Sequence, residues 1–365
     1  MDAAAVNPTP PKGRGSSLAI DSRFLDWQRE PFDDGWDDAA PAPATTLSID
    51  TARTVITYNQ SPDIPFDRSI NPYRGCEHGC AYCFARPSHA WLGLSPGLDF
   101  ETRLSYKPDA AATLRRELAA PRYRCAPIAL GVNTDAYQPV ERQLGLTREI
   151  LRVLRDCRHP VSIITKSALI ERDIDLLAEL ARDRLAHVMV SITTLQPGLA
   201  RTLEPRAARP ARRLQTVRAL AEAGVPVGVL CAPLIPALND HEIEVLLDAA
   251  AAHGAGSAGY ILLRLPREVQ PIFERWLAEH APERAARVMS LLRQSREGRA
   301  NDPRFGHRMR GSGPFVALYK QRFDLACRRL GLGARGTPLD STRFAPPALP
   351  GTQQTLFQEA GDKPS

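Results

Sequence analysis

Hydrophobic and polar positions follow two alternating patterns through the middle of the chain. Short apolar runs of strand length are each followed by a longer stretch with apolar residues roughly every three to four positions. The apolar runs predict strands at Ser69–Gly75, Ile128–Val132, Val161–Thr165, His187–Thr193, Val225–Cys231 and Ala258–Arg264. The longer stretches predict helices at Pro108–Ala119, Thr147–Cys157, Ile170–Arg182, Arg209–Ala223, Asp240–His253 and Glu268–His280.

Repeated β-then-α units predict an α/β fold in which parallel strands are joined by right-handed crossovers. Six such units are fewer than the eight of a closed barrel, so we expect a partial (β/α)6 TIM-type barrel. Two further helical stretches, Pro282–Arg296 and Pro314–Leu330, should pack with Glu268–His280 as a C-terminal helical cap. The strand ends of such a sheet meet at one mouth, where its chemistry is expected.

Both ends of the chain lack this periodicity. Residues 1–50 are rich in Pro, Asp, Ala and Gly, and residues 334–365 in Pro, Gly and Thr. These compositions are typical of flexible segments. We therefore expect a disordered N-terminal segment (1–50), a barrel core (51–267), the helical cap (268–333) and a disordered tail (334–365).

Composition narrows the class of protein. The chain has 365 residues, 43% of them hydrophobic, which is enough for a sizeable core. No stretch approaches the roughly 20 apolar residues of a membrane span, so no membrane partner is expected. Seven cysteines and no charged start leading into an apolar run argue against secretion and a disulfide framework, and favour a cytoplasmic protein.

The net charge of +6 suits a phosphate-bearing or nucleic-acid partner, because it is carried mainly by arginine. Arginines gather within residues 201–218 and again within residues 301–332. Such runs are also typical of solvated helix faces. They would form a track for a phosphate backbone if they converged on the mouth of the barrel.

Three cysteines lie close together in one short loop, as Cys76, Cys80 and Cys83. Three thiolates can hold three corners of a [4Fe–4S] cluster and leave the fourth iron open to a small molecule. The same loop, with His78, offers the ligand types of a structural zinc ion. Zinc sites usually take their ligands as two separated pairs, whereas these four residues crowd one turn.

Polar residues follow the predicted strands, among them Asn133, Thr134, Lys166 and Ser191. Lys166 is a lone lysine at a strand end in a chain that favours arginine, which suggests a point-charge contact with a carboxylate. It is alternatively a solvated loop lysine, and the other three have alternative roles in turns or helix caps. Their shared position at one mouth favours a functional role.

The C-x3-C-x2-C spacing followed by an aromatic residue resembles the cluster loop of the radical S-adenosylmethionine (SAM) superfamily. The resemblance is carried further by the order of five segments, Asn133-Thr134-Asp135, Thr165-Lys166, Ser191-Ile192-Thr193, Glu204-Pro205 and Val229–Pro233. This order is similar to that in spore photoproduct lyase and its DNA repair photolyase-like relatives. The run from Asn71 to Cys80, followed by Cys83–Arg86, resembles a bacterial subgroup of that branch. The resemblance extends from about Ile70 to Leu265.

This resemblance implies an enzyme that binds a [4Fe–4S] cluster and reductively cleaves SAM to a 5′-deoxyadenosyl radical. It implies a nucleic-acid substrate, repaired or modified, and a reductase or flavodoxin-type electron donor. The alternative function is a non-catalytic, zinc-binding nucleic-acid scaffold. One departure concerns the hydrogen-donor cysteine of the lyase, whose matching position here is Val132, and Cys125 does not correspond to it.

The resemblance also assigns individual residues. Cys76, Cys80 and Cys83 would bind the metal cluster. Asn133 and Thr134 would meet the amino group of SAM, Lys166 its carboxylate, and Ser191 its ribose or carboxylate region. Tyr82 and Phe84 would flank the adenine.

A short motif in the tail, Gln353–Phe357, resembles the pentapeptide by which bacterial replication and repair proteins dock on the sliding clamp. Leu356 and Phe357 would then fill a hydrophobic pocket of the clamp. Chance similarity and packing of the tail on its own domain are the alternatives.

Overall fold

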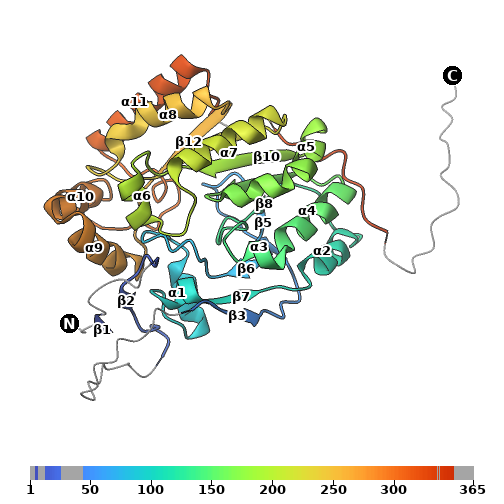
Figure 1. Ribbon diagram of the computed structural model, residues 1–365, viewed down its shortest axis with the longest axis horizontal. Coiled ribbons are helices and arrows are strands. Elements are labelled where there is room, and N and C mark those ends of the chain that lie inside the picture. The colour runs from blue at the N-terminus through green and yellow to red at the C-terminus, as the bar shows by residue number, and fades with distance from the viewer. Residues whose placement is uncertain (1–4, 7–12, 26–43, 335, 337, 349–365) are drawn as a thin grey trace, which may run out of the picture.

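The computed structural model describes residues 5–6, 13–25, 44–334, 336 and 338–348. Its central element is an open seven-stranded sheet in the order β12-β11-β10-β9-β8-β5-β4 (Figure 1). Neighbouring strands from β5 to β12 pair in parallel, and β4 pairs with β5 in antiparallel. The strands are β4 (Ile56–Tyr58), β5 (Arg68–Ile70), β8 (Ile128–Leu130), β9 (Val161–Thr165), β10 (Ala186–Ser191), β11 (Val227–Leu234) and β12 (Ser257–Leu262). The parallel strands overlap all the predicted ones, so the partial barrel is confirmed.

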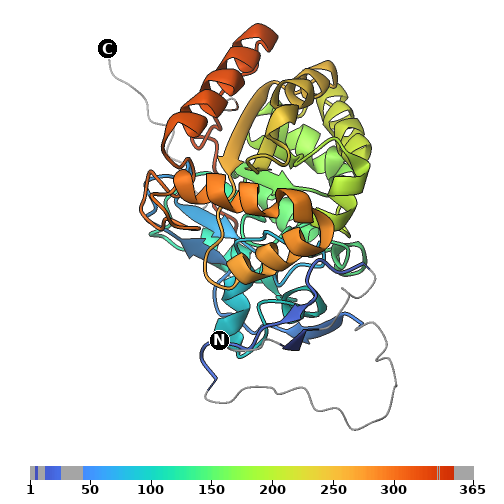
Figure 2. The ribbon, with the colours of Figure 1, turned by 90° about the vertical axis from the view of Figure 1, so that its left-hand side faces the viewer.

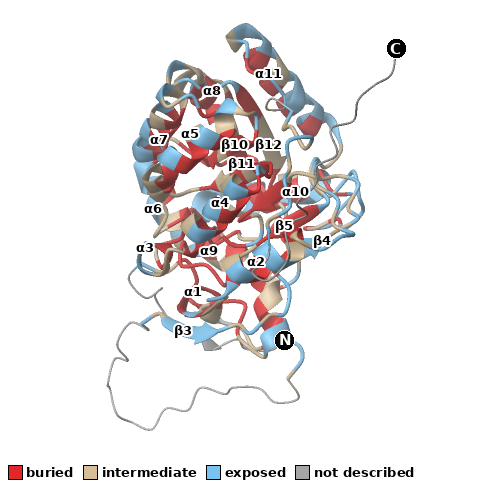
Figure 3. Cartoon of the chain, turned by 90° about the vertical axis from the view of Figure 1, so that its right-hand side faces the viewer, coloured by how far each residue is buried: buried red, intermediate tan, exposed pale blue. Residues whose placement is uncertain are grey.

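Amphipathic helices pack on the sheet and on one another, as the polar–apolar pattern predicted. They are α2 (Ala110–Leu118), α4 (Leu146–Asp156), α5 (Ile174–Arg182), α7 (Pro210–Glu222) and α8 (Ile243–Ala252). Short 3₁₀ turns, η2 (Ala168–Asp173) and η3 (Asp240–Glu242), precede α5 and α8. Figure 3 shows the buried sheet beneath these helices. The apolar side chains of the parallel strands form the centre of the main core.

The C-terminal helices divide between two places (Figure 2). Helices α9 (Val269–His280) and α10 (Pro282–Gln294) pack together and share a second core with Cys80 and Tyr82. Helix α11 (Pro314–Leu330) instead packs on α8, and its buried side chains belong to the main core. The cap over the cysteine loop is therefore built mainly from α9 and α10. None of the described helices combines the length and the apolar character needed to cross a bilayer.

The first predicted strand, Ser69–Gly75, is split in the structure. Pro72 has no amide hydrogen for the ladder, so β5 ends at Ile70 and the chain leaves the main sheet. The continuation, β6 (Tyr73–Arg74), pairs with β7 (Arg103–Tyr106) in a small second sheet. The third strand of that sheet, β3 (Thr46–Ile49), is exposed at all four positions and lies within residues 1–50, where disorder was expected.

Parts of both flanks differ from the expected disorder. Strand β2 (Leu18–Ala19) pairs with β1 (Ala5–Val6), and the amide of Gly15 donates to Glu101 Oε2 over 2.9 Å. In the tail, the amide of Ala345 donates to the Cys157 carbonyl over 2.9 Å. Hydrogen bonds to the core thus fix residues that lack periodic apolar character. The clamp-like motif 353–357 lies outside the described residues.

Candidate active site

A cavity of about 250 Å³ opens at the carboxyl ends of the parallel strands. The cysteine loop and the strand ends both contribute to its lining. From the predicted site come Cys76, Cys80, Tyr82, Cys83, Phe84, Asn133, Lys166 and Ser191. The structure thus brings every predicted site residue except Thr134 to one cavity.

Thr134 faces away from the cavity. Its hydroxyl donates to the Tyr73 carbonyl over 2.8 Å, and it lines a neighbouring groove. The backbone amide of Asn133 donates to Asn71 Oδ1 over 2.9 Å. The turn that carries Asn133 and Thr134 is therefore attached to the chain just ahead of the cysteine loop.

The backbone of the cysteine loop is fixed from several directions. The amide of Cys76 donates to the Phe100 carbonyl over 2.9 Å. The Gln138 side chain accepts from the amide of Glu77 and donates to the Gly75 carbonyl, over 2.8 and 3.1 Å. Gly79 has a φ of +66°, and a Cβ at that position would lie 2.7 Å from Glu101 Oε2. Glycine is required there both by the left-handed backbone and by the close carboxylate.

The three thiols of this loop suit a metal cluster. All are free; Cys76 and Cys80 are buried and Cys83 is partly buried. Burial raises the pKa of Cys76 well above its usual range and that of Cys80 to about 12, so the bare thiols hold their protons at neutral pH. Iron would displace those protons and supply the positive charge that buried thiolates need.

A single-ion zinc site finds no support. Within the described residues, no three His, Cys, Asp or Glu side chains form a group able to hold one metal ion. His78 is directed elsewhere, because its Nδ1 lies 3.3 Å from the Asp135 carboxylate. The cubane interpretation does not require such convergence, since the three corners of a cluster are separate iron atoms.

Asp135 connects the cysteine loop to the next strand end. Its carboxylate accepts from Thr165 Oγ1 and from the Lys166 amide, each over 2.8 Å. Burial acts to raise the pKa of Asp135, but His78 and the amide donors hold it at about 2. The carboxylate therefore stays ionised and fixes the backbone of Lys166 at the cavity.

The Lys166 ammonium lies 5.8 Å from the centroid of the Tyr82 ring. Within the described residues it makes no hydrogen bond or ion pair of its own. Burial acts to lower its pKa, but Cys80 and Glu204 outweigh burial and raise it, so the charge is retained. A retained charge at a cavity wall suits an anionic group of a ligand.

A buried ion pair beneath Tyr82 was missed by the sequence reasoning. Arg213 and Glu204, 1% and 2% exposed, pair with each other, and Glu204 also accepts from the Tyr82 phenol and from Thr193 Oγ1. Despite burial, Arg213 and Lys166 lower the pKa of Glu204 to about 2. Arg213 falls within the basic run 201–218, for which a solvated helix face was one of two interpretations. The available signal was its spacing to Val217 and Leu220 on the buried face of α7.

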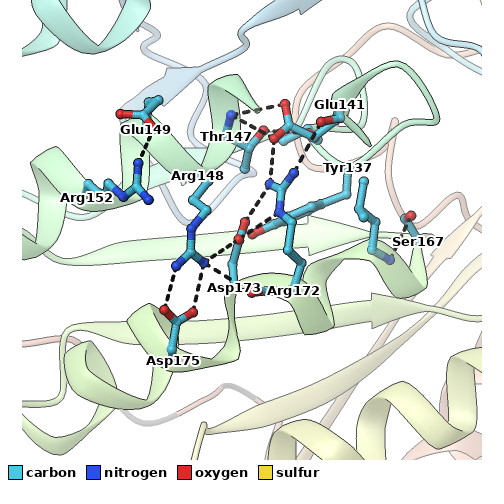
Figure 4. Close-up of polar contacts among 12 residues, drawn as sticks. Tyr137, Glu141, Thr147, Arg148, Glu149, Arg152, Ser167, Arg172, Asp173 and Asp175 are labelled. Atoms are coloured by element: carbon cyan, nitrogen blue, oxygen red, sulfur yellow. Dashed lines mark hydrogen bonds and ion pairs between the residues drawn. The ribbon is translucent and has the colours of Figure 1, made fainter. Parts of the chain in front are cut away.

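A second charged network holds the chain behind the cavity (Figure 4). Glu141, on the short helix α3 (Glu141–Leu144), is fully buried and accepts from the Tyr73 phenol and from Arg172 Nη2, the latter over 2.7 Å. Arg172 and Arg148 share the buried carboxylate of Asp173. The network ties the residues just ahead of the cysteine loop to the helices that follow β8 and β9, and so gives the loop a fixed base.

Comparisons with known proteins identify the superfamily of the chain and several relatives. The sequence model of the radical SAM superfamily matches residues 70–250. An uncharacterized protein of Mycobacterium tuberculosis (strain H37Rv) is 37% identical over 264 residues, which cover 72% of this chain and 77% of that protein. One of Methanocaldococcus jannaschii is 30% identical over 173 residues, 47% of this chain and 62% of that protein.

Among solved structures, spore photoproduct lyase complexed with dinucleoside spore photoproduct has the same fold. Its TM-score is 0.57 at 14% identity, with 79% of this chain and 81% of the lyase chain covered. The open parallel sheet is thus a known framework. The chain belongs to the radical SAM superfamily and is an enzyme whose cofactors are a [4Fe–4S] cluster and S-adenosylmethionine.

Proposed function

We propose that this radical SAM enzyme removes hydrogen from a nucleic-acid substrate bound in a groove beside the cavity. The groove has a volume of about 550 Å³ and shares Phe84, Val132, Asn133 and Arg264 with the cavity. This shared lining supports a path from the substrate to the cofactors, since a ligand in the groove would reach the cavity directly.

The charge of the groove is the observation that carries the proposal. Arg74, Lys107, Arg264 and Arg308 line it, and none of its lining residues is an aspartate or glutamate. The four cations outnumber the two carboxylates that pair with them, Asp50 and Asp63, so the groove keeps a net positive charge that suits a polyanion such as a nucleic-acid strand. Phe84, 43% exposed, offers an aromatic surface near the same place. A base of a duplex would have to leave its stack to reach the cavity, so a single-stranded or extruded nucleotide fits best.

The basic runs noted in the sequence do not form this groove together. Within residues 201–218, Arg206, Arg212 and Arg213 pair with Glu77, Glu171 and Glu204. Neither these arginines nor any other residue of that run lines the groove. From residues 301–332, Arg308 and Met309 do. The support therefore comes from a local set of cations rather than from the net charge.

Residues of the cavity would bind the cofactors as follows. Cys76, Cys80 and Cys83 would hold the cluster, which when bound and reduced supplies the electron that splits SAM into methionine and a 5′-deoxyadenosyl radical. The Lys166 ammonium would meet the carboxylate of SAM, because no described group neutralises it by direct contact.

The remaining predicted residues would orient SAM. Asn133 would approach its amino group, Ser191 its ribose or carboxylate region, and Tyr82 and Phe84 its adenine. Tyr82 is already held in one orientation by Glu204, and the Ser191 hydroxyl donates to the Ala232 carbonyl over 3.2 Å. Thr134 would act indirectly, by holding the turn that presents Asn133.

Val132 bears on the type of reaction. It lines both the cavity and the groove, where the resemblance to the lyase would place a hydrogen-donor cysteine. Apart from the three thiols of the loop, no cysteine is among the residues that line either space. We therefore propose a reaction on nucleic acid that needs no protein thiol as hydrogen donor.

Transfer of deuterium tests the proposal. The reconstituted enzyme, SAM and a chemical reductant would be incubated with single-stranded oligonucleotides carrying deuterium on their sugar carbons, or on the thymine methyl group. Mass spectrometry should find deuterium in the 5′-deoxyadenosine that forms, and unlabelled oligonucleotides provide the baseline. Formation of 5′-deoxyadenosine without deuterium from any of these oligonucleotides would contradict the nucleic-acid substrate and leave the cleavage of SAM intact.

A further inference from the structure

We infer that Arg264 binds a phosphate of the substrate at the junction between the groove and the cavity. This inference rests on the proposed nucleic-acid substrate and specifies how that substrate is held. Arg264 follows the end of β12 by two residues and is among the residues that line both spaces. A ligand atom beside it would therefore lie at the point where a strand in the groove turns toward the cofactors.

The other cations of the groove already have carboxylate partners. Arg74 and Lys107 share the carboxylate of Asp50, over 2.8 and 3.0 Å, and Arg308 pairs with Asp63 over 2.6 Å. Arg264 makes no hydrogen bond or ion pair with any described residue. Its charge is therefore the one in the groove lining that has no carboxylate partner in the described part of the chain.

The surroundings of Arg264 disfavour an isolated charge. Burial and the nearby Arg308 lower its pKa by more than Asp63 and Cys83 raise it, although a guanidinium remains protonated at neutral pH. Arg296 is also close enough to interact with it unfavourably, and that side chain is committed to the Leu263 carbonyl over 2.6 Å. An incoming anion would relieve both the desolvation and the repulsion.

Stacking on Phe84 does not use up the binding capacity of Arg264. The guanidinium carbon lies 4.4 Å from the centroid of the Phe84 ring. A cation–π contact of this kind takes up no lone-pair acceptor, so the N–H donors of Arg264 keep their hydrogen-bonding capacity. Those donors are the ones that bind phosphate in bidentate fashion.

The position of Arg264 also explains how a nucleotide would be aligned with the cavity. Phe84 follows Cys83 directly in the chain, so Arg264 stacks on a residue of the cysteine loop itself. A phosphate held at Arg264 would place the attached sugar and base beside the opening of the cavity. Arg264 would thus be a positioning residue that contacts the substrate backbone, and it would not select a particular base.

Salt-dependent binding of a fluorescently labelled single-stranded oligonucleotide to the anaerobically reconstituted enzyme tests this role. For R264Q we expect binding about tenfold weaker or more, and a slope of log K against log salt smaller in magnitude by about 0.7, the value for one lost single-strand phosphate contact. R264K should recover the slope but not the full affinity, because it keeps the charge and loses the bidentate geometry. R267Q is the matched control, since Arg267 is exposed and lines neither space; its binding should be unchanged.

The affinity for SAM should be the same in R264Q as in the unmodified enzyme. This measurement separates a role of Arg264 in substrate binding from a structural role. Oligonucleotide binding by R264Q equal to that of the unmodified enzyme would overturn the role of Arg264 and leave the proposed substrate standing. Loss of SAM affinity in R264Q would assign Arg264 to the cofactor and overturn the inference. Failure of the unmodified enzyme to bind any oligonucleotide would overturn the proposed substrate and the inference with it.

Discussion

Replacing Arg213 with methionine should destabilise the protein strongly, because it leaves the Glu204 carboxylate buried without its main counter-charge. Arg213 is 1% exposed, and besides Glu204 its guanidinium donates to the Ala208 and Ser191 carbonyls over 2.7 and 2.9 Å. Methionine keeps much of the aliphatic volume and removes the charge and these donors. Breaking a buried pair in this way typically costs about 3–5 kcal/mol.

The pKa of Glu204 gives an independent magnitude. It is lowered from 4.5 to about 2 in the folded protein, with burial opposing and Arg213 the largest favourable cause. Each pKa unit corresponds to about 1.4 kcal/mol, so ionisation of Glu204 contributes about 3 kcal/mol to stability at neutral pH. Because the folded pKa is the lower one, this contribution is present above pH 4.5 and is lost as the pH falls toward 2.

The deficit of Arg213→Met should therefore depend on pH. It should be largest at neutral pH and should shrink as the pH falls toward 2, because protonated Glu204 no longer needs a counter-charge. Urea unfolding of protein freed of its cluster by a chelator, with the thiols kept reduced, would measure the loss of stability without interference from acid loss of the cluster. Arg329→Met is the matched control, since Arg329 pairs with Asp248 over 2.8 Å with side chains 57% and 45% exposed. Such exposed pairs contribute about 1 kcal/mol or less.

A deficit for Arg213→Met no larger than that for Arg329→Met would refute the assigned role of the buried pair. A large deficit that stays constant between pH 7 and pH 2 would show instead that lost packing or lost carbonyl contacts dominate. The linkage argument through Glu204 would then be wrong even though Arg213 is structurally important.

Three further predictions concern the cofactors and the tail. Changing any one of the three loop cysteines to alanine should abolish the visible absorption of the reconstituted cluster and its four-iron content, whereas Cys231→Ala, on buried β11, should leave both in place. Lys166→Ala should weaken binding of SAM by about 1.5–3 kcal/mol, as expected for a lost charge-assisted hydrogen bond. Calorimetry on reconstituted protein would measure this loss, and Lys320→Ala, at an exposed position of α11, should leave the affinity unchanged. A chain ending at Ala348 should keep its cluster and its Tm and lose any affinity for the sliding clamp; equal clamp binding by the full-length and shortened chains, or none by either, would exclude docking through residues 353–357.

The sequence predicted the parallel sheet well because its strands are buried on both faces. A buried parallel strand is a continuous apolar run, and β8 and β11 stand out for this reason. Strand β3 alternates polar and apolar residues over only four positions, none of them buried, and it was not distinguished from the Pro- and Asp-rich segment that contains it. The contacts of residues 13–25 have the same origin. Gly15 donates its backbone amide and fits against the loop because it has no side chain, and neither property produces a periodic pattern of apolar residues in the sequence.

The cavity was predictable and its charged support was not. Strand-end residues are brought together by the topology itself, so the order of strands was enough to place Lys166 and Ser191 near the cysteine loop. Glu204 and Arg213 lie nine positions apart in the sequence, and each resembles an ordinary surface charge there. Their pairing depends on the exact packing of α7 against the strands, which a single sequence does not show. Thr134 was misplaced for a related reason, because the direction of a side chain within a turn is set by local hydrogen bonds.

The packing around the cysteine loop covers two of its sides and leaves it accessible from the groove. On one side, a Cβ at Gly15 would lie 1.6 Å from the Gly79 carbonyl oxygen, so the N-terminal segment is in direct contact with the loop. On another, α9 and α10 share a core with Cys80 and Tyr82. Cys83 is the least buried of the three thiols, and the next residue, Phe84, is exposed where the cavity meets the groove. A radical formed in the cavity would thus face the groove, and any substrate would have to be positioned there, beside Arg264, before SAM is cleaved.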